Sequence, residues 1–412
     1  MVDNTLSPHG GQLVERLATQ SFSASFHGSL KSIPVNDQIA RECINIAYGV
    51  FSPLEGFMTK EDVDAVLEKM ALANGYVWSI PIVLDVSERD IDEMALVEGD
   101  TLLLTYQDQP LATLEVEQVF PYDLEHMARR VYGTMDESHP GVVRTTNLKD
   151  RFIGGKVSLV NEPGINPPFD RFWYPPAQLR NMLADKGWER VVAHQTRNVP
   201  HVGHEGFMKG AWFASGADGV LVSAVIGEKR IGDYIDEAIV LAQETLRNAG
   251  YFGEDVHATS VLMWDMRYAG PKEAVFHAIV RKNMGCTHHM FGRDHAGVGS
   301  FYDPRASHQI FQEIPPIGIV PVTMGEWWHC PACEGVAYEG LCGHRDRKLD
   351  LSGTLMRQTL EQEITPPFLT FRPEVFDVVK ECTREYGAGS SFVTQEYLAN
   401  RRPVITMLPP GG

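Results

Sequence analysis

The 412-residue chain is 43% hydrophobic and 22% charged, a composition typical of a globular protein with about two or three domains. Its formal net charge of −18 excludes a general electrostatic surface for nucleic acid, so an anionic ligand needs a local cluster of Arg and His. The apolar stretches are too short to cross a bilayer, and the polar N-terminus lacks the apolar core of a signal peptide. We therefore predict a cytoplasmic protein without membrane or nucleic-acid partners.

Residues 1–170 predict a mostly β domain, with a barrel as one form it can take. Short apolar runs alternate with turn residues, and residues 112–119 alternate between apolar and polar side chains with the period of a half-buried strand. One helix is expected at 60–70. A proline-rich stretch at 161–168 predicts a linker to the next domain.

Residues 171–324 follow a different rhythm, in which helices and strands alternate. Helices are expected at 178–186, 205–214, 233–249 and 271–285, and strands at 190–193, 219–225, 260–264 and 288–291. This βαβ repetition predicts a Rossmann-like parallel sheet with helices on both faces. Residues 325–412 contain a cluster of Cys and His and a helix at 373–386, which predicts a small C-terminal domain. The fold class is thus multidomain α/β.

A polar segment follows the apolar run 191–193 and brings together two amides, a guanidinium and two imidazoles: Gln195, Arg197, Asn198, His201 and His204. In a doubly wound sheet, ligands bind outside the carboxyl ends of the strands, which is where this segment falls. It offers several hydrogen-bond donors and no fixed negative charge before Glu205. These properties suit a polyanion, and phosphate chemistry in particular.

A second polar turn, 292–299, follows the strand expected at 288–291. Its glycines allow a ligand to approach the backbone, and Arg293 can fork onto phosphate or sulfate oxygens. Taken singly, a loop His, a Gly-rich turn or an Arg–Asp pair is more often structural. Their occurrence together at two strand ends predicts one cavity, in which Arg197 and Arg293 converge on a bound nucleotide.

Three of the six cysteines form a compact pattern with a histidine, Cys330-x2-Cys333-x8-Cys342-x-His344. The pattern favours a structural Zn²⁺ site over three unrelated buried thiols or a redox dithiol. Four protein ligands leave no open position, so such a zinc ion is non-catalytic. His344 is the favoured fourth ligand and His329 the alternative. The remaining cysteines are expected to be small buried hydrophobes: Cys43, Cys286 and Cys382.

Six motifs in chain order carry a resemblance to a known family. They are FSPLEGFM at 51–58, PIVLDV at 81–86, QTRNVPHVGH at 195–204, MRYAGP at 266–271, GRDHAG at 292–297 and LSGT at 351–354 with Arg357 behind it. Together they resemble ATP sulfurylase (sulfate adenylyltransferase). The resemblance implies an N-terminal domain with a PUA-like fold, a central nucleotidyltransferase domain, and transfer of the adenylyl group of MgATP to sulfate, giving adenosine 5′-phosphosulfate and pyrophosphate.

The resemblance also implies roles for individual residues. Catalysis falls to Thr196, Arg197, Asn198, His201 and His204. Substrate binding falls to Gln195, Arg197, Asn198, Gly292, Arg293, Asp294, His295 and Ala296. In this scheme Gln195, Arg197 and the backbone N–H of Ala296 hold sulfate. The two histidines stabilise charge on the α-phosphoryl group and the departing pyrophosphate. Relatives with a comparable zinc site have their His a little further past the third Cys, which keeps both candidates for the fourth ligand open.

Other interpretations remain open at this stage. A nucleotidyltransferase could use the same His pair on another acceptor, and a PUA-like domain with a zinc knuckle could bind RNA, although the acidic charge and the lack of a basic stripe count against RNA. Residues 320–325 are expected either beside the adenine or in a buried core strand. No GxxxxGK[ST] motif occurs, so a fused APS kinase domain is not expected. The partners are the substrates and, by frequency alone, a second copy in a homodimer.

Overall fold

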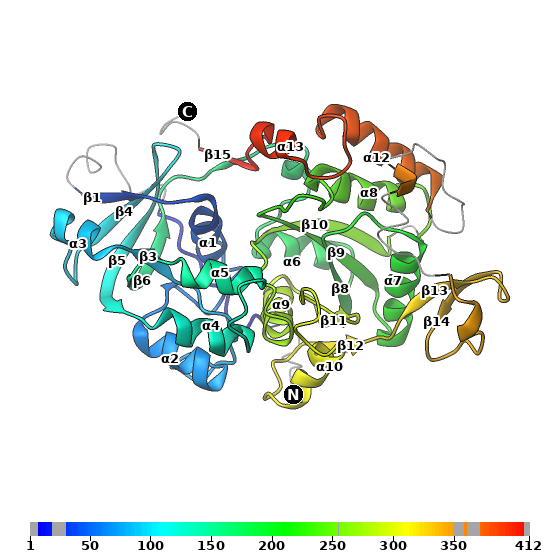
Figure 1. The fold of residues 1–412 in the computed structure, drawn as a ribbon, viewed down its shortest axis with the longest axis horizontal. Helices are drawn as coiled ribbons and strands as arrows, with labels where there is room; N and C mark the ends of the chain where they lie inside the picture. The colour runs from blue at the N-terminus through cyan, green and yellow to red at the C-terminus, as the bar shows by residue number, and fades with distance from the viewer. Residues whose placement is uncertain (1–6, 19–29, 254, 350–357, 361–370, 408–412) are drawn as a thin grey trace.

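The computed structural model describes residues 7–18, 30–253, 255–349, 358–360 and 371–407. The LSGT motif at 351–354 and Arg357 lie outside the described residues. Figure 1 shows two lobes side by side, each built around one sheet, with a hairpin protruding beyond the second lobe.

The first lobe contains the mostly β domain that the sequence predicts. Its six-stranded sheet has the order β1 (Lys31–Pro34), β4 (Thr101–Tyr106), β5 (Gln109–Pro121), β6 (Arg151–Leu159) and β2 (Gly56–Phe57), with β3 (Leu84–Val86) also pairing with β6. All pairs are antiparallel except β1 with β4. The helices of this lobe are α1 (Asp37–Ala47), α2 (Lys60–Lys69), α3 (Glu88–Met94), α4 (Leu124–Tyr132) and α5 (Pro140–Thr146).

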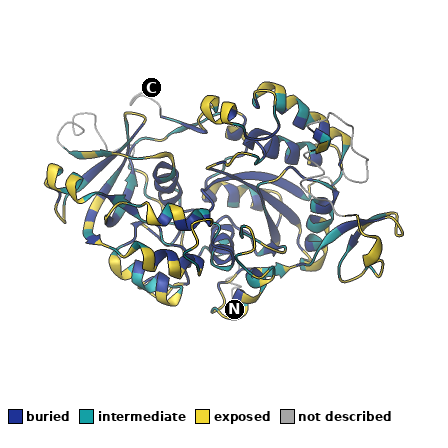
Figure 2. Cartoon of the chain, in the orientation of Figure 1, coloured by how far each residue is buried: buried dark blue, intermediate teal, exposed yellow. Residues whose placement is uncertain are grey.

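The second lobe is the predicted parallel α/β domain. Its five parallel strands have the order β10 (His257–Met263), β9 (Gly219–Ile226), β8 (Val191–Thr196), β11 (His288–Phe291) and β12 (Val320–Thr323). Its main helices are α6 (Pro176–Asp185), α7 (Val202–Ser215), α8 (Asp236–Asn248) and α9 (Pro271–Asn283). Every residue of β9 and β10 is buried, as expected for strands covered on both faces. Figure 2 shows this burial of the sheet. The strand order reverses between β8 and β11, so the switch point of the sheet lies between these two strands.

Two boundaries differ from the prediction in ways that matter for the site. Strand β8 continues to Thr196, so Gln195 and Thr196 belong to the strand and not to the turn. Helix α7 begins at Val202, three residues before the predicted start, because His201 acts as its N-cap. Histidine is not among the residues that commonly cap helices, so the sequence did not predict that α7 begins after His201.

The C-terminal part of the chain packs against both lobes. A hairpin of β13 (Trp327–Cys330) and β14 (Gly335–Tyr338) follows β12, the short helix α10 (Ala306–Gln309) precedes it, and α12 (Pro373–Glu385) packs on α8. After α13 (Gln395–Asn400), strand β15 (Ile405–Thr406) pairs with β7 (Gly164–Ile165). The predicted linker at 161–168 therefore contains a strand that binds the C-terminal segment. Short 3-10 helices lie at Phe169–Arg171, Ile310–Gln312 and Arg345–Arg347.

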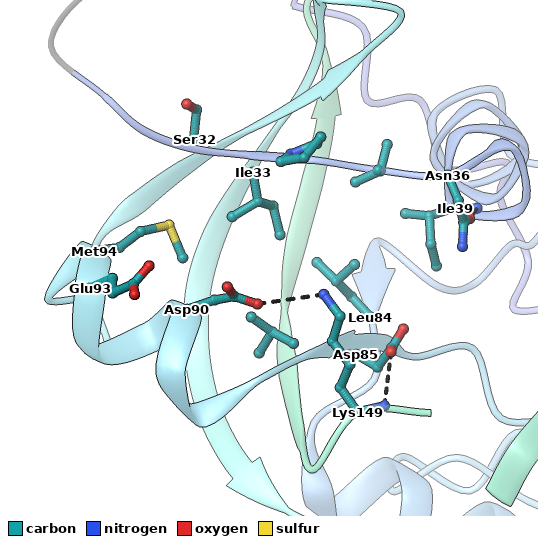
Figure 3. A pocket seen from close by; sticks show the side chains of 13 residues that line it. Ser32, Ile33, Asn36, Ile39, Leu84, Asp85, Asp90, Glu93, Met94 and Lys149 are labelled. Atoms are coloured by element: carbon teal, nitrogen blue, oxygen red, sulfur yellow. Dashed lines mark hydrogen bonds and ion pairs between the residues drawn. The ribbon is translucent and has the colours of Figure 1, made fainter. Parts of the chain in front are cut away.

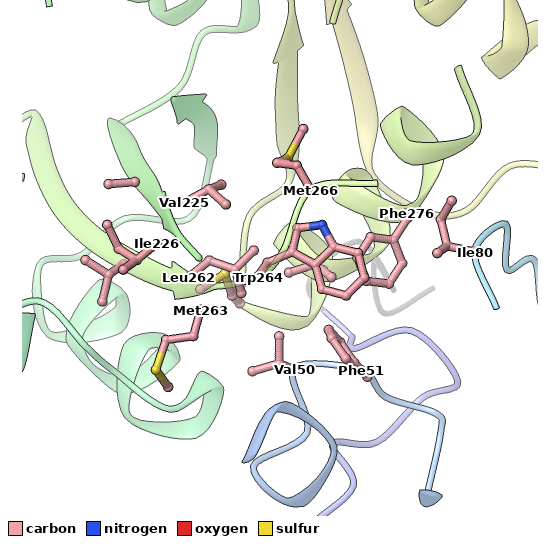
Figure 4. Close-up of a cluster of buried hydrophobic side chains, with 14 of the residues drawn as sticks. Val50, Phe51, Ile80, Val225, Ile226, Leu262, Met263, Trp264, Met266 and Phe276 are labelled. Atoms are coloured by element: carbon pink, nitrogen blue, oxygen red, sulfur yellow. The ribbon is translucent and has the colours of Figure 1, made fainter. Parts of the chain in front are cut away.

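The interface between the lobes is an aromatic core. The ring of Trp264, which follows β10, lies 5.6 Å from Phe51 of the first lobe and 4.6 Å from Phe276 of α9 (Figure 4). Buried ion pairs flank it: Arg41 of α1 bonds Asp265 at 2.9 Å, and Arg267 bonds Glu42. Cysteines 43, 286 and 382 are buried, as predicted.

Candidate active site

A crevice of about 270 Å³ opens at the switch point between β8 and β11. Both polar turns contribute to it. Its lining residues are His194, Gln195, His201, Gly203, His204, Phe207, Met290, Gly292, Arg293, His295 and Trp327. The structure thus brings together Gln195, both motif histidines, and Gly292, Arg293 and His295 of the second turn, as the position of the two segments at strand ends predicts.

The two motif histidines form the N-terminal cap of α7. His201 Nδ1 accepts hydrogen bonds from the backbone N–H groups of Gly203 (3.0 Å) and His204 (3.3 Å), and His204 Nδ1 accepts from the backbone N–H of His201 (3.4 Å). A neutral imidazole that accepts through Nδ1 carries its proton on Nε2. The capping geometry therefore assigns both rings, whose centroids are 3.9 Å apart, as Nε2–H donors.

Both imidazoles are neutral at pH 7. Burial lowers the pKa of His204 to about 4, and burial followed by the neighbouring His204 lowers the pKa of His201 well below its ordinary value. The N-terminus of a helix carries positive partial charge, which also favours an anion over a cation here. The cap is thus a neutral pair of donors on a positive helix end, a setting that suits phosphoryl or sulfuryl oxygens.

Gln195 enters the crevice from the end of β8 and is held by α9. Its Oε1 accepts a hydrogen bond from Arg281 Nη2 (2.8 Å), and its amide nitrogen lies 2.9 Å from His277 Nδ1. His277 Nδ1 lies 3.1 Å from His295 Nε2 of the second turn. Side chains of α9 therefore contact both polar segments.

The second turn adopts a strained backbone that the sequence did not reveal. Asp294 and Ala296 have positive φ angles of 56° and 58°, in the left-handed region that L-residues seldom occupy. Side chains of α10 fix the turn, since Ser307 Oγ donates to the carbonyl of His295 (2.9 Å) and His308 Nε2 lies 2.9 Å from the carbonyl oxygen of Gly292. Strain of this kind persists only where the surroundings hold it, and it clusters at ligand sites.

Arg197 does not reach the crevice that Arg293 lines. Its Nη2 lies 2.9 Å from Asp233 Oδ2 and 3.0 Å from the carbonyl of Glu228, and its guanidinium stands 5.8 Å from the ring of Tyr268. These partners follow β9 and β10, so Arg197 turns away from β11, whereas Arg293 is exposed and lies 3.6 Å from Glu326. In this structure the two guanidinium groups have separate acidic partners, and their convergence on one bound nucleotide stays a prediction. Asp233, on the loop after β9, forms an ion pair with Arg197.

The remaining predicted residues of the first turn stabilise its backbone. Thr196 Oγ1 accepts from the backbone N–H of Asn198 (3.0 Å) and donates to the Asn198 carbonyl (3.2 Å). The side chain of Thr196 is buried and Asn198 is exposed. In this conformation neither side chain lines the crevice.

Sequence reasoning missed several residues of the site. His194, Phe207 and Trp327 line the crevice, and His277 and Arg281 support it from α9. A signal for the last two was present, because Glu273, His277 and Arg281 recur every four residues on one helix and are all fully buried. Such a polar stripe on a buried helix face is rare in ordinary cores.

The cysteine cluster has the geometry of a tetrahedral metal site. The ligand atoms of Cys330, Cys333, Cys342 and His344 all lie within 4.8 Å of one another. Cys333 Sγ is 3.8 Å from Cys342 Sγ and 3.4 Å from His344 Nδ1. Zn–S and Zn–N bonds of about 2.3 and 2.1 Å at tetrahedral angles give edges of about 3.8 and 3.6 Å. His329 is not part of the cluster, so the geometry favours His344.

The hairpin that carries this cluster also builds a wall of the crevice. Trp327 of β13 packs into a groove on α7 formed by two glycines, where an added Cβ at Gly210 would lie 2.5 Å from its ring and one at Gly206 3.0 Å. Strand β12, which leads into the hairpin, is an edge strand with partly exposed residues. It is therefore not the buried core strand that was one expectation for 320–325.

A larger hollow, of about 460 Å³, lies in the first lobe between β1, β3 and α3 (Figure 3). Its polar groups pair with one another: Lys149 Nζ lies 3.5 Å from Asp90, and the backbone N–H of Lys149 donates to Asp85 (2.9 Å). Volume alone would favour this hollow, but it lacks the convergent donors of the switch-point crevice.

The parallel sheet and its switch-point crevice place the protein among the Rossmann-like α/β proteins, in which ligands bind outside the carboxyl ends of the strands. A family model described as ATP-sulfurylase matches residues 170–382, and one described as a PUA-like domain matches residues 6–162. The chain belongs to the ATP-sulfurylase family, with a PUA-like N-terminal domain.

Individual relatives agree with this assignment over nearly the whole chain. The sulfate adenylyltransferase of Archaeoglobus fulgidus is 39% identical over 96% of this chain and 95% of the relative. Those of Pyrococcus abyssi and Ignicoccus hospitalis are 40% and 42% identical, each over 90% of this chain and 97% of the relative. A hexameric APS kinase from Thiobacillus denitrificans shares the fold, with a TM-score of 0.71 at 22% identity over 92% of this chain and 68% of that chain. Within the described residues, no helix has both the length and the apolar character to cross a membrane.

Proposed function

We propose that this protein is a sulfate adenylyltransferase, which joins sulfate to the α-phosphoryl group of ATP and releases pyrophosphate in a reversible reaction. The observation that carries the proposal is the pair of Nε2–H donors that His201 and His204 present at the N-terminus of α7, facing the Arg293 turn across the switch point. The curated relatives named sulfate adenylyltransferase support the same activity.

The chemistry requires positioning and charge neutralisation more than a nucleophile or a base. Sulfate is a weak nucleophile, and charge accumulates on the phosphoryl oxygens as pyrophosphate departs. His201 and His204 donate to those oxygens, and a bound triphosphate favours their protonated forms, since an adjacent anion raises an imidazole pKa. Gln195 and the Ala296 backbone hold sulfate, and the turn from Gly292 to His295, with Arg293 and Asp294, holds the nucleotide.

Arg197 takes part only after a rearrangement. Its guanidinium has to exchange Asp233 for a substrate oxyanion, while Thr196 and Asn198 keep the turn closed through their mutual hydrogen bonds. Mg²⁺ enters as the MgATP complex, because none of the residues that line the crevice is a carboxylate that would bind the ion independently.

Zn²⁺ is the second metal of the proposal. Three thiolates and His344 Nδ1 suit tetrahedral zinc, with all four positions taken by protein. Bound there, the ion would be structural, and its four ligands would hold the hairpin whose Trp327 closes one side of the crevice.

The division of the chain and its assembly also stand as proposals. We place domain boundaries near residues 170 and 324, with residues 325–412 forming a C-terminal part that stays attached to both lobes through α12 and β15. A homodimer is the proposed assembly, on the general frequency of two-fold symmetric oligomers.

The test is sulfate-dependent exchange of labelled pyrophosphate into ATP by the purified protein, together with one variant. His204→Ala removes a donor to the phosphoryl oxygens, and we expect turnover to fall by about 10²–10³ with little change in unfolding temperature. His288→Gln is the matched control, since His288 contacts Thr287 and does not line the crevice. Exchange that proceeds without sulfate, or an undiminished His204→Ala rate, would contradict the proposal.

A further inference from the structure

Arg281 is a buried cation whose hydrogen-bonding capacity is mostly unused. It lies on α9 with no solvent exposure, and its Nη2 donates to Gln195 Oε1 at 2.8 Å. Its Nε and Nη1 have no hydrogen-bond partner, and within the described part of the chain no carboxylate forms an ion pair with it. Burial lowers its pKa to about 10, so the guanidinium is still charged at pH 7.

The groups that surround Arg281 do not neutralise it. The histidines around it, His194, His277, His289 and His295, are uncharged at pH 7, because burial above all lowers the pKa of each. Glu273, a buried carboxylate on the same helix face, accepts from the indole N–H of Trp264 and the backbone N–H groups of Arg267 and Ala269, and it lies 3.4 Å from His277 Nε2.

An unpaired buried charge is costly, so its presence calls for a compensating ligand. Removing an ion from water without a partner costs several kcal/mol, and the other buried arginines at the lobe interface are paired. Two further polar groups on the same side of the sheet also lack partners, Ser223 Oγ and His289 Nε2. The parallel register places Ser223 beside Gln195 and His289 beside Ala193, so these groups share the face that Arg281 approaches.

The hydrogen bond from Arg281 fixes the orientation of the Gln195 amide. Because Arg281 holds Oε1, the amide nitrogen of Gln195, with its two N–H donors, points towards His277 and Met266. One hydrogen serves His277 Nδ1, and the other faces the thioether of Met266 at 3.7 Å, a weak acceptor that an oxyanion can replace. A flipped amide would instead present a carbonyl oxygen, which repels an anion.

We propose that Arg281 is a positioning residue for the oxyanion substrate, which orients the donor side of Gln195 towards a tetrahedral dianion and supplies the buried positive charge that compensates it. The inference rests on the proposed function, and it names sulfate, or another tetrahedral dianion such as selenate, as the group that completes this site.

The test compares Arg281→Met with Arg281→Lys in the full-length protein, using the sulfate and ATP KM values in pyrophosphate exchange. Hydrogen bonds to charged groups are worth about 1.5–3 kcal/mol, so we expect Arg281→Met to raise the sulfate KM about 10- to 100-fold. The ATP KM should change less than about threefold, since Arg281 does not line the crevice. Arg281→Lys keeps the charge but loses the forked guanidinium. Its sulfate KM should therefore lie between those of the unsubstituted protein and Arg281→Met.

Unfolding temperatures measured without any oxyanion separate this role from a purely structural one. Arg281→Met removes an unpaired buried charge, so its unfolding temperature should match or exceed that of the unsubstituted protein. Arg180→Met is the matched control: Arg180 donates to the carbonyls of Lys282 and Asn283 at the end of the same helix, so this variant should unfold earlier with an unchanged sulfate KM.

The proposed activity and the role of Arg281 would be contradicted by different results. If the unsubstituted protein shows no sulfate-dependent exchange, the proposed function fails. If it does exchange, and Arg281→Met keeps the normal sulfate KM or simply unfolds at low temperature, only the role of Arg281 is overturned.

Discussion

Two clusters of buried charge differ in how completely they are paired. At the lobe interface, Arg41 bonds Asp265 and Arg267 bonds Glu42, so each buried guanidinium has a carboxylate. Beneath the switch-point crevice, Arg281 has only the neutral Gln195. The difference indicates that the first cluster fixes the lobes against each other, whereas the second is complete only when an anion binds.

The largest effect is expected from breaking the paired cluster. Arg267→Met leaves Glu42 buried without its partner, and we expect the free energy of unfolding to fall by about 3–5 kcal/mol, as measured by urea denaturation. Burial raises the pKa of Glu42, so part of this loss is recovered where Glu42 can take up a proton.

The double variant Glu42→Gln with Arg267→Met is the control for this comparison. It removes both charges, so it should recover much of the stability that the single variant loses. If Arg267→Met proved as harmless to stability as Arg281→Met, the distinction between paired and unpaired clusters would be lost.

A smaller effect is expected from the zinc hairpin. Chelation should increase hydrogen exchange in β13 and β14 while the two sheets keep their protection, because the four proposed ligands lie in the hairpin and the segment after it. Since Trp327 lines the crevice, the ATP KM should rise by a few-fold before exchange activity is lost. Protein purified without any bound zinc, or a hairpin whose exchange is unchanged by chelator, would refute the zinc assignment.

The sequence predicted the elements and failed on side-chain pairing. Periodicity located the parallel strands, and the position of two polar segments after β8 and β11 predicted a shared crevice correctly. The direction of Arg197 could not be predicted, because Asp233 lies thirty-six residues away and its approach depends on how the loop after β9 folds. The same is true of α9, whose Arg281 meets Gln195 only once the sheet has formed.

Local chemistry set a further limit on the prediction. The capping role of His201 depends on which ring nitrogen accepts from the backbone, and the left-handed conformations of Asp294 and Ala296 depend on contacts from α10. By contrast, the spacing of the Cys and His residues was enough to predict the metal-site cluster, because a CxxC turn and a nearby second segment can place four ligands in a tetrahedron.

The most direct test of the central claim is the location of a bound oxyanion. Crystals grown with selenate and an ATP analogue whose α–β bridge is methylene would locate selenium through its anomalous scattering. The account predicts selenate within hydrogen-bonding distance of the Gln195 amide nitrogen, at the crevice between β8 and β11. Selenate bound instead in the larger hollow of the first lobe, or on a surface away from Gln195, would contradict it.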